Sequence, residues 1–168
     1  MVNKLFIFLH LRVSVIIAIM LFVPSVINGA SISIVLQDVN SAPYTTWIIS
    51  PPMALNVSTT MVSSQALKVI INANGKIDLN AAATSTGPWT AGAVAGVNIY
   101  KLELKAFPLQ QGAPNLSAGT TTILETSTLF DSKQGKGTRW VYAKFSTPTS
   151  TTSGQPQMIM VTITATVH

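Results

Sequence analysis

The sequence predicts an all-β protein: a single immunoglobulin-like antiparallel β-sandwich of about seven to nine strands, preceded by a signal peptide helix. Three observations lead to this fold class. Several segments alternate apolar and polar residues with a period of two, which is typical of strands with one buried face. Turn-forming residues recur about every 8 to 12 residues, as in two-sheet sandwiches. After residue 30 no segment has the 3.6-residue period of an amphipathic helix.

Residues 1–30 have the order of a secretory signal peptide: a basic start, an apolar middle and small residues at the end. The apolar run 13–26 is shorter than the roughly 20 residues that a spanning helix needs, so an uncleaved anchor is the weaker alternative. We therefore expect cleavage near Ala30, no membrane span afterwards, and one domain over 31–168. The protein is then secreted, periplasmic or on the cell surface.

Charge and cysteine content narrow the class of partner. The chain has ten basic and five acidic residues, a net charge of +5. Removing residues 1–30 takes away Lys4 and Arg12, so eight basic residues remain against five acidic ones, a net charge of +3. The basic residues are scattered, which argues against nucleic acid as a partner. Cysteine is absent, so the fold must be stable without disulfides.

The first half of the domain contains five predicted strands. In segment 31–37, Ile32, Ile34 and Leu36 share one face. Segments 44–50 and 54–62 are rich in β-forming residues and are separated by two prolines. Segments 66–72 and 76–84 flank Asn74-Gly75, a pair that favours the positive φ angles of a two-residue turn. This pair predicts a β-hairpin.

The second half contains four more predicted strands, separated by loops rich in Gly, Pro, Ser and Thr. The clearest alternation places Tyr100, Leu102, Leu104 and Ala106 on one face. The predicted strands are 97–107, 120–125, 138–146 and 159–167, and the predicted loops are 85–96, 108–119, 126–137 and 147–156. Short connections argue against parallel sheets, and an up-and-down barrel is the main alternative to a sandwich.

The succession NANGKIDLNAAA, GPWTAG, VNIYKLELKAF and GTRWVYAKFSTPTSTTSGQPQMIMVTITATV resembles a group of small exported bacterial proteins with immunoglobulin-like sandwiches. The resemblance covers roughly residues 53–167. This chain has Lys76 where a second Asn is common in that group. The resemblance implies a fold and export, and it brings no catalytic residues with it.

The residue types needed for catalysis or metal binding are scarce. After residue 30 the only histidine is His168, which excludes a Ser-His-Asp triad and makes a metal site improbable. Glu103 lies between Lys101 and Lys105 on the polar face of its predicted strand. This pattern predicts a solvent-exposed stripe of charged side chains that pair with charges on a neighbouring strand. Asp131, in a predicted loop, leaves open a calcium site made with loop carbonyls. We expect no enzyme, no catalytic residue, no metal and no cofactor.

The aromatic residues allow two interpretations. Trp89, Trp140 and Tyr142 are candidates for a flat platform that stacks on sugar rings, with Trp89 in a Gly- and Pro-containing loop as the most exposed ring. The alternative is that they fill the core of a cysteine-free sandwich. The pattern of segment 138–146 does not decide which of its faces is buried.

These observations predict an exported structural or interaction protein of the cell envelope or exterior, such as a self-assembling surface or pilus-like filament subunit. Its partners would be proteins, including copies of itself. The candidate assembly strand carries Ile32, Ile34 and Leu36, which a chain can donate to a neighbour's sheet edge. The alternative function is a non-catalytic carbohydrate-binding module that holds a polysaccharide on the aromatic platform.

Overall fold

The computed structural model describes most of the chain after residue 30. The described residues are 31–44, 47–49, 53–85, 87–153 and 157–168. The predicted signal peptide 1–30 lies outside them, and so do parts of three predicted segments, 44–50, 85–96 and 147–156.

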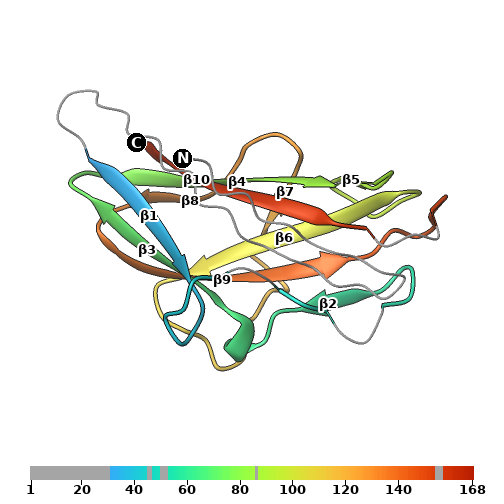
Figure 1. Cartoon of the computed structure of the whole chain (residues 1–168), viewed down its shortest axis with the longest axis horizontal. Helices are drawn as coiled ribbons and strands as arrows, with labels where there is room; N and C mark the ends of the chain where they lie inside the picture. Colours follow the sequence, from blue (N-terminus) through green and yellow to red (C-terminus); the bar gives the residue numbers. More distant parts are fainter. Residues whose placement is uncertain (1–30, 45–46, 50–52, 86, 154–156) are drawn as a thin grey trace.

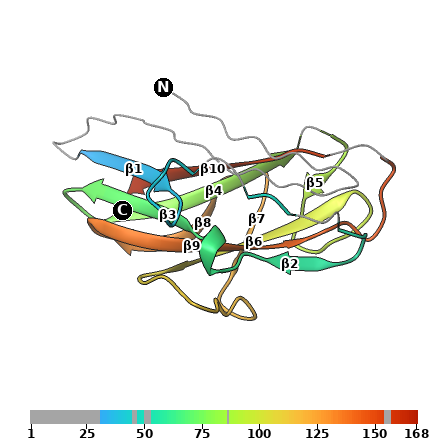
Figure 2. The same ribbon diagram turned by 60° about the horizontal axis from the view of Figure 1, so that its bottom comes forward.

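The described strands form two antiparallel-dominated sheets that face each other (Figures 1 and 2). The larger sheet has the order β1 (Ile32–Gln37), β3 (Leu67–Ala73), β9 (Gly137–Ser146), β6 (Ile99–Phe107) and β5 (Thr90–Ala91), with β2 (Ser58–Thr60) beside β9 and β7 (Thr121–Ile123) beside β6. The smaller sheet has the order β10 (Ile159–Val167), β4 (Ile77–Ser85) and β8 (Thr128–Gln134), and one 3-10 turn, η1 (Ser63–Gln65), precedes β3. The predicted all-β class with two layers is confirmed.

The core lies between the two sheets and follows the predicted alternation. Every second residue of the long strands points inward, among them Ile71, Leu79, Leu102, Phe145 and Ile163, which are all at most 1% exposed. Burial of apolar area is worth about 25 cal/mol per Å², so this layer supplies most of the stabilisation in a chain without disulfides.

The predicted hairpin at Asn74-Gly75 is wrong. β3 hydrogen-bonds to β1 and β9, whereas β4 hydrogen-bonds to β10 and β8, so the two strands belong to different sheets. Neither Asn74 nor Gly75 has a positive φ, which the expected turn would require. The connection is an arch that crosses from one sheet to the other, and the apolar faces of β3 and β4 both belong to the core cluster between the sheets.

Two further segments differ from the prediction. The expected strand 44–50 is not a strand at its described residues, where only Trp47 takes part in a β-bridge, and Tyr44 and Trp47 anchor the chain in the core, at 6% and 2% exposure. The expected loop 126–137 contains the strand β8, which pairs with β4 through an irregular register. Its single clear apolar pair, Leu129 and Phe130, gave too little alternation to indicate a strand.

The arch can be tested through Gly75. Because Gly75 has no positive φ and an added Cβ would meet no atom within 4 Å, Gly75→Ala should leave the free energy of unfolding unchanged or raise it by up to about 1 kcal/mol. Gly119, with φ +67°, is the matched control, and Gly119→Ala should lower it by about 1–2 kcal/mol. Urea denaturation measures both. A loss of about 1 kcal/mol or more in Gly75→Ala would favour the hairpin turn instead.

Candidate functional site

The outer face of the larger sheet is partly covered by the loop between β6 and β7. In Figure 2 this loop hangs below β6 and β9, on the side away from the smaller sheet. Tyr142 of β9 points to this outer face, and its hydroxyl accepts a hydrogen bond from the Gln111 backbone N–H (2.8 Å) and donates one to the Gln111 carbonyl (3.0 Å). The Phe107 ring packs edge-on against Tyr142, with 5.7 Å between centroids. Both faces of β9 are therefore buried at this point.

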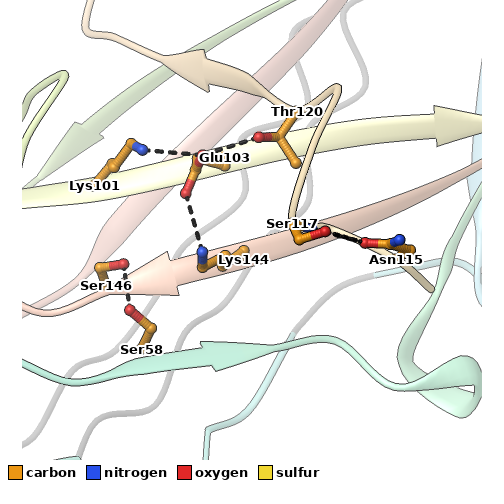
Figure 3. Close-up of polar contacts among 8 residues, drawn as sticks. All are labelled: Ser58, Lys101, Glu103, Asn115, Ser117, Thr120, Lys144 and Ser146. Carbon is orange, nitrogen blue, oxygen red and sulfur yellow. Dashed lines mark hydrogen bonds and ion pairs between the residues drawn. The ribbon is translucent and has the colours of Figure 1, made fainter. Parts of the chain in front are cut away.

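Glu103 is the centre of an ion-pair cluster on the same outer face (Figure 3). Its carboxylate lies 3.0 Å from Lys101 Nζ and 3.8 Å from Lys144 Nζ, and it accepts a hydrogen bond from Thr120 Oγ1 at 2.9 Å. Lys144 stands directly opposite Glu103 in the β6–β9 register, so the predicted cross-strand pairing is confirmed. The predicted solvated stripe is wrong at Glu103, which is only 8% exposed because the chain near Thr120 closes over it.

The electrostatics of this cluster favour an ionised carboxylate. Burial alone would raise the pKa of Glu103, but hydrogen bonds from Lys101 and Thr120 and the charges of Lys101 and Lys144 outweigh it, so the pKa is lowered. A general acid working near neutral pH needs the opposite shift. The cluster therefore acts as a clamp that holds β6, β9 and the end of the covering loop together.

A second carboxylate joins the two sheets. Asp131 of β8 lies 3.3 Å from Arg139 Nε of β9, in the opposite sheet, and accepts a hydrogen bond from Gln134 Nε2 at 2.7 Å. Burial raises the pKa of Asp131 and outweighs the effect of Arg139, which lowers it. The premise of a calcium loop is wrong, because Asp131 stands in a strand and already faces a cation. Within the described residues, no three His, Asp or Glu side chains gather as a metal ion would require.

The predicted aromatic platform is not formed. Trp89 is 5% exposed, belongs to the core and donates a hydrogen bond from Nε1 to Thr151 Oγ1 at 2.8 Å. Tyr142 is fully buried under the covering loop. Trp140 is partly buried, with Lys68 Nζ 6.0 Å from its ring centroid. The three rings present no shared exposed plane, because the loop that carries Trp89 folds its indole inward.

The candidate assembly strand is an integral edge strand. β1 pairs with β3 along all six of its residues, and Ile34 and Leu36 are buried at 4% and 5% exposure, with Ile32 partly buried beside them. β10 is the edge strand of the other sheet, and the two edges lie near each other on one side of the molecule (Figures 1 and 2). The β10 edge was not predicted from the sequence, although nine residues without charge, Gly or Pro are the signal that indicates it.

The hollows on the described surface contain few chemical groups. One of them, of about 540 Å³, lies at one end of β1 and β3 and is lined by Ser31, Ile32, Ser33, Asn72, Ala73, Asn74 and Lys136. A second, of about 300 Å³, lies beside Tyr44 and Trp47. The first contains serines with Lys136 and the second Ser64 with Asp38, but no hydrogen bond among the described residues joins a serine hydroxyl to either group. Among the described residues the sheet edges therefore remain the best candidate for a functional site.

No protein-family model, no curated protein and no solved structure matches this chain. In the described part of the chain, no helix is both long enough and apolar enough to cross a membrane.

The Glu103 clamp predicts a specific pH dependence. Its pKa in the folded state lies below the ordinary 4.5, so its stabilisation is present above pH 4.5 and is lost as the pH falls through the folded-state value. Glu103→Gln should lower the free energy of unfolding by about 1–3 kcal/mol at pH 7 and remove this part of the acid dependence. Urea denaturation from pH 7 to pH 3 measures both. Glu125→Gln, at an exposed position, is the control and should change stability by less than about 0.5 kcal/mol.

The position of Trp89 predicts a stability effect. Trp89→Ala should lower the free energy of unfolding by about 3–5 kcal/mol, because it removes a buried ring and its hydrogen bond to Thr151. Leu109→Ala, at a side chain that is 71% exposed, should change it by less than about 0.5 kcal/mol. A stable Trp89→Ala variant that had lost retardation in a polysaccharide gel would restore the platform hypothesis.

Proposed function

We propose that this chain is an exported structural or interaction protein of the cell envelope or exterior, which assembles with protein partners, including copies of itself, through sheet edges. The observation that carries the proposal is the placement of two edge strands, β1 and β10, near each other on one side of the molecule. An edge strand presents unpaired N–H and C=O groups, which another chain can complete as an added strand.

The surroundings of Ser31 are compatible with export and removal of residues 1–30. The Ser31 backbone nitrogen lies 3.1 Å from Asn74 Oδ1. After cleavage at Ala30 this nitrogen becomes the terminal ammonium, and the Asn74 carbonyl oxygen is a suitable acceptor for it. The resemblance to small exported bacterial proteins points in the same direction, and we include an immunoglobulin-like topology of the two sheets in the proposal.

Carbohydrate binding is the weaker proposal, because two of its three candidate rings are buried. An enzymatic function also has little support. The two well-placed carboxylates, Glu103 and Asp131, face Lys or Arg side chains in ion pairs. Both observations favour an interaction protein.

Export and assembly can be tested together in a bacterial host that expresses the full chain. We expect a product outside the cytoplasm whose mass begins at Ser31, measured by intact mass spectrometry. Light scattering and negative-stain microscopy should show oligomers or filaments. Ile16→Arg, which interrupts the apolar run of the leader, is the control and should remain in the cytoplasm at full length. A wild-type chain that stays unprocessed in the cytoplasm would contradict export.

A further inference from the structure

The hydrogen-bonding direction of β10 follows from its pairing with β4. The register places Val167 opposite Ile77, and the His168 N–H donates to the Lys76 carbonyl at 3.0 Å, one pair further along. In an antiparallel ladder, hydrogen-bonded and non-hydrogen-bonded pairs alternate. The even-numbered residues of β10 therefore bond to β4, and the odd-numbered ones direct their N–H and C=O groups away from it. The Ala83 N–H agrees with this assignment, since it turns away from β10 to the Leu124 carbonyl.

The outward-directed groups of β10 have no strand partner among the described residues. β10 ends the order of the smaller sheet, and β1, the nearest strand of the other sheet, pairs with β3 instead. The backbone groups concerned belong to Ile159, Val161, Ile163, Ala165 and Val167. They form a continuous row of donors and acceptors along one side of the molecule.

β10 also lacks the features that usually protect an edge strand. Natural edges are blocked by charged side chains, prolines, bulges or a short length. The nine residues Ile159–Val167 include no charged residue, Pro or Gly, and their pairing with β4 has no register shift. The outer face of the strand carries only Met160, Thr162, Thr164 and Thr166. Among the described residues, nothing in β10 itself blocks its edge against a strand of similar character.

β10 is complementary to a second copy of itself. Two residues that lie opposite each other in an antiparallel pair have their side chains on the same face of the sheet. Because side chains alternate along β10, an odd-numbered residue must therefore lie opposite an odd-numbered residue of the second copy, and an even-numbered one opposite an even-numbered one. The register centred on Ile163 gives the longest overlap. It opposes Thr162 with Thr164, Val161 with Ala165, and Ile163 with its own copy. Hydroxyl then meets hydroxyl on the outer face, and apolar meets apolar on the core face.

We propose that two copies of this chain pair antiparallel through β10, about a two-fold axis at Ile163. The three-stranded sheets of the two copies then form one six-stranded sheet, in the order β8-β4-β10-β10-β4-β8. The odd-numbered residues, whose backbone groups are unpaired, form the hydrogen-bonded pairs of the new ladder, while Thr162 and Thr164 form a non-hydrogen-bonded pair, in which side chains are closest. This inference rests on the proposed function and specifies its partner and contact.

The register can be tested by a charge exchange at Thr162 and Thr164. Thr162→Lys with Thr164→Lys brings like charges together across the axis and should weaken association about tenfold or more. Thr162→Lys with Thr164→Glu places opposite charges face to face in the same register and should associate at least as tightly as the wild type. Light scattering against concentration measures association of the full chain as exported, and melting temperature checks that each variant folds.

Ala82→Lys with Thr84→Lys is the charge-matched control. It adds the same two lysines to the same face, one strand inside the edge, and should leave association within about threefold of the wild type. Hydrogen exchange should show the Ile163 amide protected in the associated wild type and exchanging in the Lys-Lys variant.

A monomeric wild type, or equal association of the Lys-Lys and Lys-Glu variants, would overturn the β10 pairing. The second result, with an exported and assembled wild type, would leave the proposed function in place and move the contact elsewhere. A wild type that is monomeric would count against both the pairing and the assembly part of the proposed function.

Discussion

The structure depends on the burial of one apolar face from each of two sheets against the other. The chain has no cysteine, so nothing covalent holds the layers together. Residues such as Ile71, Leu79 and Phe145 come from three strands of the two sheets and are all fully buried. The requirement that each sheet cover the other explains why the chain crosses between layers after β3. A local hairpin would have placed the apolar residues of β3 and β4 beside each other on one face.

The few charged groups of the domain serve mainly to position its parts. Glu103 holds the covering loop on the outer face of the larger sheet, and Asp131 with Arg139 joins the two layers. The two carboxylates have opposite pKa shifts because Glu103 has two cations and a hydroxyl donor, whereas burial dominates at Asp131. Both acids lie in ion pairs with basic side chains of β6 or β9.

The two-sheet architecture also determines which parts of the molecule can pair with strands of other protein chains. Two-layered sheets have edges unless they close into a barrel. Here two edge strands, β1 and β10, lie on one side, and the low charge content leaves β10 without the lysines that protect many edges. A core that needs no disulfides and an uncharged edge strand agree with the proposed function, in which the protein contacts other chains.

By itself the sequence determined the all-β class, the positions of most strands and which residues of a strand share a face, because alternation is a property of neighbouring residues. It left open which face of strand 138–146 is buried. Tertiary structure alone decided which sheet each strand joins, since that depends on partners far away in the chain. It also decided the burial of Trp89 and Glu103, because a loop covers a side chain only after the chain has folded back. β8 was not predicted for the same reason. It is a strand because it pairs with β4, and its own weak alternation of apolar and polar residues does not indicate this pairing.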